Sequence, residues 1–164
     1  MPRLHTIATA AIAAFTASFA LGAQAAGTVQ VNFVEPGKFT DVSGAYLDRE
    51  RNLESLKRHL QDAAAPYVAD GQTLKIDVLD VDLAGEVRFG VRPYDVRVLR
   101  GRADWPRIEM RYTLEGAGQA ARSGQARVQD MAYLQRLSGL QQGQALVHER
   151  RMLDQWFKGE FAPR

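Results

Sequence analysis

A stretch of strict alternation from Trp105 to Leu114 (WPRIEMRYTL) constrains the fold of this chain more than any other feature. Apolar side chains recur there at every second position, namely at Ile108, Met110, Tyr112 and Leu114. Because successive side chains of a strand point to opposite faces, this pattern predicts a β-strand with one buried face and one face in water. The rest of the chain must then provide neighbouring strands and a layer that covers the buried face.

Three weaker stretches also have strand character. Residues Thr28 to Val34 alternate and end at the turn Glu35-Pro36-Gly37. Residues Tyr94 to Leu99 are a short strand candidate. After a hairpin turn at Gly116 to Gly118, residues Gln119 to Val128 return as a more polar strand, which we place at the edge of the sheet.

The stretch from Thr73 to Leu83 (TLKIDVLDVDL) is rich in β-branched and aliphatic residues, but its apolar face switches midway. In an unbroken strand, the apolar residues up to Val78 would share a face with Asp80 and Asp82. A one-residue slip moves every later side chain to the opposite face. The pattern therefore predicts a bulge or a marked twist near Leu79.

Two segments have the period of an amphipathic helix. The first runs from about Asp48 to Tyr67 and the second from about Ala145 to Phe161. On the polar side of the second helix we place Glu149, Arg150, Arg151, Asp154 and Lys158. The stretch from Met131 to Leu140 is ambiguous and fits a short helix before a loop.

The order of strand, helix, several mostly antiparallel strands and helix predicts an α+β fold. We expect a four- or five-stranded, mostly antiparallel sheet with the two amphipathic helices on one face, in two layers. Residues 26–164 suit a single domain, because a domain of about 150 residues buries roughly 68–70% of its unfolded surface.

The first 25 residues have the pattern of a cleavable signal peptide. A short basic start with Arg3 precedes an apolar stretch from Ile7 to Leu21, and Ala23-Gln24-Ala25 follows as an A-x-A cleavage site. We expect the mature chain to begin at Ala26 and to be periplasmic, with release to the medium left open. An uncleaved anchor is the alternative, but the stretch is mostly alanine, which favours insertion weakly. No later segment is apolar enough to span a membrane.

The composition excludes several functional classes. With no cysteine, the chain has no disulfide, no thiolate nucleophile and no lipid-modified cysteine. Of the 21 Lys and Arg residues only Arg3 precedes Ala26, which leaves 20 basic against 19 acidic side chains and argues against nucleic-acid binding. His59 and His148 alone cannot provide a three-ligand zinc site. No phosphate loop, dinucleotide fingerprint or G-x-S-x-G motif occurs, so we expect no cofactor or metal and favour a non-enzyme.

An acidic group, formed by Asp77, Asp80, Asp82 and Glu86, is the first candidate site. Carboxylates two residues apart on a strand face the same way and could share a hard cation such as calcium. The pattern fails as an EF-hand loop, because Ala84 and Val91 occupy ligand positions. The favoured interpretation is a polar strand end at which Asp82 caps a turn.

A second candidate combines several arginines with an aromatic corner. The arginines are Arg97, Arg100, Arg102, Arg107 and Arg111, and the corner is Asp104-Trp105-Pro106. The arginines could pair with the carboxylates or bind an anionic envelope ligand, and cross-strand charge pairing is the simpler interpretation. Trp105 either packs in the core, which we favour, or stands exposed as a binding anchor.

Several blocks of the sequence resemble a known family. They are Thr73-Leu74-Lys75-Ile76, Asp80-Val81-Asp82-Leu83-Ala84-Gly85-Glu86, Asp104-Trp105-Pro106-Arg107-Ile108-Glu109, Arg111-Tyr112-Thr113-Leu114, Asp130-Met131-Ala132-Tyr133-Leu134 and Glu149 to Phe157. In this order they resemble the bacterial secreted proteins grouped as domain of unknown function 3016, over nearly the whole mature chain. The resemblance implies an exported single-domain protein and provides no catalytic residue. The segment from Gln135 to His148 matches none of these blocks.

These observations favour a non-catalytic periplasmic binding or adaptor protein. Its partner would be an envelope protein or another component of the cell envelope, and its candidate binding residues are Asp80, Asp82, Glu86, Asp104, Trp105 and Arg107. One alternative is a small carboxylate- or calcium-dependent hydrolase of envelope polymers. Another is an inhibitor of a periplasmic enzyme that inserts a loop such as Phe89 to Pro93 into its target.

Overall fold

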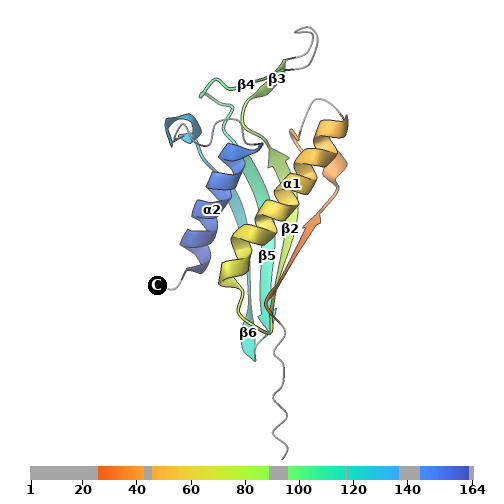
Figure 1. The fold of residues 1–164 in the computed structure, drawn as a ribbon, viewed down its shortest axis with the longest axis vertical. Coiled ribbons are helices and arrows are strands. Elements are labelled where there is room, and N and C mark those ends of the chain that lie inside the picture. The colour runs from red at the N-terminus through yellow and green to blue at the C-terminus, as the bar shows by residue number, and fades with distance from the viewer. Residues whose placement is uncertain (1–25, 43–45, 89–95, 117, 137–144, 163–164) are drawn as a thin grey trace, which may run out of the picture.

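A computed structural model describes residues 26–42, 46–88, 96–116, 118–136 and 145–162 of the chain (Figure 1). The main sheet contains β1 (Thr28–Phe33), β2 (Gln72–Asp82), β5 (Arg107–Gly116) and β6 (Gln119–Gln129) in the order β1-β2-β5-β6. A separate two-stranded sheet pairs β3 (Glu86–Arg88) with β4 (Val96–Val98). The helices are α1 (Tyr46–Ala64) and α2 (Val147–Phe161), with short 3-10 helices η1 (Pro36–Lys38), η2 (Ala65–Tyr67) and η3 (Tyr133–Arg136).

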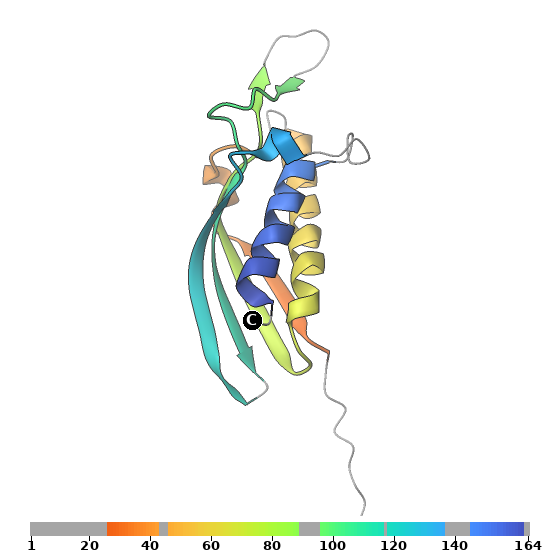
Figure 2. The ribbon, with the colours of Figure 1, turned by 90° about the vertical axis from the view of Figure 1, so that its left-hand side faces the viewer.

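The sheet is mixed, and its helices cover one face. Strands β1 and β2 are parallel and are joined by α1, whereas β2, β5 and β6 follow one another as antiparallel neighbours. Seen from the side, both helices lie against the same face of the sheet (Figure 2). The predicted two-layer α+β fold is therefore confirmed, with β6 at the predicted edge.

The core forms between the helices and the inward face of the sheet. Its fully buried side chains include Leu74, Ile76 and Val78 of β2, Ile108 and Met110 of β5, Leu56 and Leu60 of α1, and Leu153 and Phe157 of α2. Burying a side chain of this size contributes about 1.5–3 kcal/mol relative to leaving it exposed. The apolar periodicity of the two strands and two helices thus accounts for the packing of the layers.

The register of β2 shifts where its apolar pattern switches. Its pairing with β5 is irregular between Val78 and Asp80, so the bulge predicted near Leu79 is confirmed. The bulge keeps Val81 buried after Val78 and leaves Asp80 and Asp82 on the outward side, half-buried. It therefore sets the direction of the carboxylates of the acidic group.

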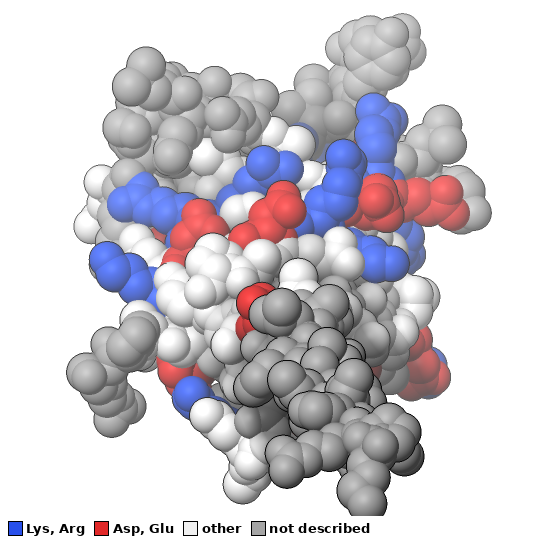
Figure 3. All heavy atoms as spheres, turned by 60° about the horizontal axis from the view of Figure 1, so that its bottom comes forward, with Lys and Arg blue, Asp and Glu red and all other residues white. Residues whose placement is uncertain are grey.

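Cross-strand ion pairs cover the open face of the sheet. The partners are Lys75 and Glu115, Asp77 and Arg111 at 3.0 Å, Glu109 and Arg127 at 3.4 Å, and Asp82 and Arg107 at 2.6 Å. The first three pairs are largely exposed and contribute about 0–1 kcal/mol each, so they mark a solvated face more than a source of stability, whereas the Asp82–Arg107 pair is part-buried. On the side of the molecule shown in Figure 3, acidic and basic side chains are also interspersed.

The described helices are short or polar. Within the ranges given above, no helix is long and apolar enough to cross a membrane.

Candidate functional site

The structure brings the two sequence blocks singled out above to one end of the sheet. The Gly85 amide donates to the Asp104 carbonyl at 2.8 Å, and Asp82 pairs in register with Arg107. Between these points the β3–β4 hairpin projects beyond the main sheet (Figure 1). We call this region the hairpin end and define it as residues 80–88 and 96–107.

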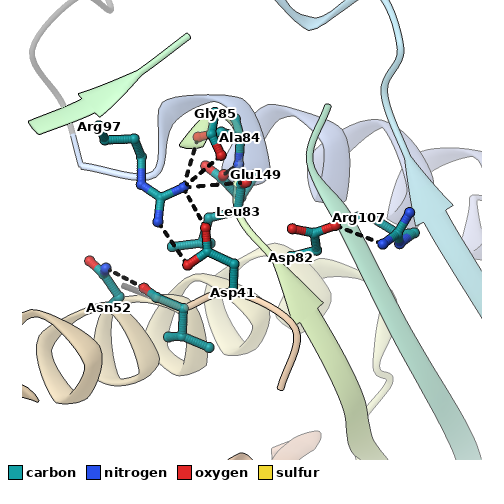
Figure 4. Close-up of polar contacts among 10 residues, drawn as sticks. Asp41, Asn52, Asp82, Leu83, Ala84, Gly85, Arg97, Arg107 and Glu149 are labelled. Carbon is teal, nitrogen blue, oxygen red and sulfur yellow. Dashed lines mark hydrogen bonds and ion pairs between the residues drawn. The ribbon is translucent and has the colours of Figure 1, made fainter. Parts of the chain in front are cut away.

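Arg97 clamps the root of the hairpin to the main sheet. Its Nη1 donates to the carbonyls of Ala84 and Gly85 at 3.1 Å each, and more weakly to that of Leu83 at 3.4 Å. The same guanidinium pairs with both carboxylate oxygens of Asp41 at 3.0 Å (Figure 4). Planar guanidinium donors suit such a fork of acceptors, so one side chain fixes the turn from β2 into β3.

Asp41 is itself held by the end of β2. Its amide donates to the Val81 carbonyl at 2.9 Å, and its carbonyl accepts from the Leu83 amide at 3.0 Å. The segment after η1 thus continues alongside β2 as an isolated parallel bridge. These backbone contacts hold Asp41 in place, so its carboxylate lies where Arg97 binds it.

Gly85 has a conformation and a neighbourhood that only glycine satisfies. Its φ is +84°, and a Cβ there would lie 2.6 Å from the Val98 carbonyl oxygen. The close approach lets β4 return over the turn, next to the carbonyls that Arg97 binds. A side chain at this position would force the two segments apart.

Glu149 is buried, so its predicted place on the polar side of the second helix is wrong. The residue is 2% exposed, and its Oε1 accepts a hydrogen bond from the Ala84 amide at 2.8 Å. Its location in the first turn of α2 lets the helix dipole stabilise the negative charge. The carboxylate thus joins α2 to the same turn that Arg97 holds from the other side (Figure 4).

Asp82 is paired and yet electrostatically disfavoured. Burial raises its pKa above the usual range, and the nearby carboxylates of Asp41 and Asp80 add to this rise. The positive charges of Arg107 and Arg97 act in the opposite direction without outweighing it. The folded state therefore disfavours the charge of Asp82, mainly because the carboxylate is partly buried, although Arg107 and Arg97 lie nearby.

The other two candidate carboxylates of the acidic group have separate partners. Asp80 accepts hydrogen bonds from the amide and the hydroxyl of Thr40, both at 2.7 Å. Glu86 is exposed and lies 3.6 Å from Arg100. The structure therefore distributes these carboxylates over different contacts.

Asp104 organises the loop that precedes β5. Desolvation opposes its ionisation, but hydrogen bonds from the amides of Arg100 at 2.6 Å and Arg102 at 2.8 Å outweigh it and lower the pKa of Asp104. The neighbouring Trp105 is half-buried, and its Nε1 is enclosed without a hydrogen-bond partner in the described part of the chain. The corner is thus a rigid turn with a partly covered indole.

Two leucines at this end are exposed, which the sequence pattern did not predict. Leu99 is 41% exposed, and Leu134 of η3 is 39% exposed. A Cβ on Gly101 would lie 2.7 Å from Leu134 Cδ1, which places η3 against the loop after β4. Tyr133, buried beside it, accepts a hydrogen bond from the Gly101 amide at 3.2 Å. Two exposed apolar side chains therefore lie near the charged groups of this end.

The described residues contain no group of three or more His, Cys, Asp or Glu side chains that could hold a metal ion. The histidines have structural contacts instead. His59 Nε2 lies 3.0 Å from both the Arg150 carbonyl and an Asp154 carboxylate oxygen, which links α1 to α2. His148 is buried edge-on against Tyr133, with ring centroids 4.7 Å apart. Residues 89–93, the loop expected of an inhibitor, lie outside the described residues.

The fold and this site define a two-layer α+β domain with a clamped, projecting hairpin. The chain belongs to the family described as protein of unknown function (DUF3016), whose model matches residues 27–159. The resemblance seen in the sequence is thus confirmed. Neither the comparison with curated proteins nor that with solved structures found a match.

Proposed function

We propose that this chain is a non-catalytic binding protein of the bacterial cell envelope that docks a protein partner on its hairpin end. The observation that carries the proposal is the convergence of the two sequence blocks beside the exposed Leu99 and Leu134. Partner-binding surfaces combine an apolar centre with a polar rim. Here the leucines provide the centre, and Glu86, Arg100 and Arg102 provide exposed charges around it.

The clamp around Arg97 supports this function. A two-stranded hairpin is marginally stable alone, yet here its root has ionic and backbone contacts to β2 and to Asp41. A surface that is already ordered loses less conformational entropy when it binds. The contacts therefore hold the hairpin in one orientation for a partner.

The leader supports an envelope location for this function. Residues 1–25 have the basic start, apolar stretch and A-x-A site of a signal peptide, which an exported protein needs. A periplasmic or released protein meets envelope proteins as its first partners. The proposal therefore includes removal of the leader after Ala25.

Crosslinked co-purification tests the proposal. The full chain, tagged at its C-terminus, would be expressed in its source cells, crosslinked mildly and purified from the envelope, with partners identified by mass spectrometry. We expect a mature N-terminus at Ala26 and one dominant partner. The double substitution Leu99→Ala and Leu134→Ala should deplete that partner by at least about tenfold, since a partner would bury the exposed two-fifths of each side chain, worth roughly 0.6–1.2 kcal/mol each.

Gln125→Ala is the matched control, because Gln125 is exposed on β6, outside the hairpin end. Circular dichroism melting would show that all variants fold. Equal recovery of the partner with the double variant and the control would contradict the docking surface. An N-terminus at Met1 would contradict removal of the leader.

A further inference from the structure

A groove between β6 and α2 lies outside the hairpin end. Its volume is about 560 Å³. The apolar part of its lining consists of Val128, Met131, Ala132, Met152 and Trp156. Met131 is 60% exposed, which is unusual for a large apolar side chain next to a core. The groove is thus large enough for one or two side chains of a ligand.

One wall of the groove is the edge of the sheet. Strand β6 pairs with β5 on one side and with no described strand on the other. Three consecutive residues at its end, 127–129, line the groove. An unpaired strand edge offers amide and carbonyl groups to another extended chain. Several peptide-binding domains bind their ligands in this way, as an added strand at an exposed sheet edge.

A buried carboxylate oxygen at the groove adds a chemical preference. Asp130 is 9% exposed and lines the groove. Its Oδ1 accepts from the Ala132 amide at 3.0 Å, whereas its Oδ2 is buried with no hydrogen-bond partner in the described part of the chain. A buried acceptor without a donor loses the hydrogen bonds that water would give it, which is energetically unfavourable. A hydrogen-bond donor carried by a ligand would remove this cost.

Arg127, the basic side chain in the groove lining, forms an ion pair outside the groove. Arg127 Nε lies 3.4 Å from Glu109 on the open face of the sheet. Asp130 therefore gives the groove an acidic character, and a lysine or arginine side chain complements it. A second copy of the chain is the alternative occupant of the β6 edge, which pairs with no strand on this side among the described residues.

We propose that this groove binds an extended peptide segment that adds a strand to the free edge of β6. An apolar side chain of the peptide packs against Met131, Met152 and Trp156. A basic side chain two positions further along lies on the same face of the peptide strand and donates to Asp130. This site shares no lining residue with the hairpin end, so a substitution can abolish one kind of binding and leave the other.

The test uses three synthetic peptides and the full mature chain. The probe is acetyl-TTLTKTT-amide, which places Leu and Lys on one face of a strand. Acetyl-TTLTETT-amide reverses the charge, and acetyl-TTLPKTT-amide removes one amide donor and disfavours strand pairing. Binding is followed by amide chemical shifts in ¹⁵N-labelled protein.

We expect the probe to shift amides of residues 127–132 and 152–156 and to leave those of β3 and β4 unchanged. The Glu and Pro peptides should bind about tenfold more weakly, as the loss of one charge-assisted or main-chain hydrogen bond predicts. Asp130→Asn, which keeps the Oδ1 acceptor, and Met131→Ala should weaken the probe similarly. Leu99→Ala is the matched apolar control and should have no effect.

Several results would overturn the proposal. Absence of shifts up to 5 mM probe, or equal affinity of the three peptides, would exclude strand addition with a basic side chain. Equal competition by n-butylammonium would assign the groove to a small cation. If analytical ultracentrifugation shows a dimer, and this dimer does not bind the probe, the β6 edge is occupied by a second copy of the chain.

Discussion

Two aspartate–arginine pairs join the same strands, β2 and β5, in different surroundings. Asp77 and Arg111 lie near the middle of the open face at 3.0 Å, and the arginine is 58% exposed. Asp82 and Arg107 lie at the hairpin end at 2.6 Å, with both side chains about 25% exposed. The shorter distance would suggest that the second pair is the more favourable one, but the pKa shifts indicate the opposite.

The surroundings decide the sign of each shift. Hydrogen bonds from Asn32 and Arg111 lower the pKa of Asp77, so the folded state favours its charged form. Desolvation by burial raises the pKa of Asp82, and the negative charges of Asp41 and Asp80 raise it further. The positive charge of Arg107 lowers it without outweighing these effects. The folded state therefore gains stability from the charged form of Asp77 in the middle of the sheet, whereas at the hairpin end it disfavours the charge of Asp82. Residues kept at such a cost are candidates for function.

The largest expected loss of stability follows from removing Arg97, which binds Asp41 and the turn between β2 and β3. Arg97→Ala removes donors to the turn carbonyls and leaves the partly buried Asp41 without its cation. We expect a loss of about 2–4 kcal/mol in the free energy of unfolding. Arg111→Ala is the matched exposed control and should cost about 0.2–1 kcal/mol. Urea unfolding of both variants measures the difference, and equal losses would contradict the clamp.

A smaller loss is expected at the middle pair. Asp77→Asn removes a carboxylate whose charged form the folded state favours, so stability at pH 7 should fall by about 0.2–1 kcal/mol. A lowered folded-state pKa contributes stability above the unfolded value near 3.8, and this contribution disappears as pH falls through the folded pKa. Wild type and variant should therefore converge in acid. A difference that does not narrow as pH falls below 3.8 would show a loss of packing instead.

The sequence predicted the elements of the fold better than the contacts of the site. Alternation and helical spacing report which side of one element is buried, and even the bulge after Val78 followed from a switch of faces within β2. The pairing of Asp41 with Arg97 spans 56 positions and depends on tertiary structure. The burial of Glu149 had no local signal either, because its partner is the backbone amide of Ala84. Local periodicity cannot identify such partners.

The smallest and most discriminating effect is expected at Asp82. Asn at this position mimics the protonated form, which the raised pKa shows to be the form that the folded state favours. Asp82→Asn should therefore keep or increase stability at pH 7, although it removes the carboxylate partner of Arg107. The contrast with the loss at Asp77→Asn isolates the effect of the surroundings.

The pH dependence gives the sign of this last effect. As pH rises from the unfolded value near 3.8 through the higher folded value, the unfolded chain ionises Asp82 first, so wild type loses stability relative to the variant. Below that window both side chains are neutral and the two proteins should match. Urea unfolding from pH 3.5 to 7 measures the divergence. If Asp82→Asn instead loses more stability than Asp77→Asn at pH 7, the attraction of Arg107 outweighs burial, and the hairpin end stores no unfavourable charge.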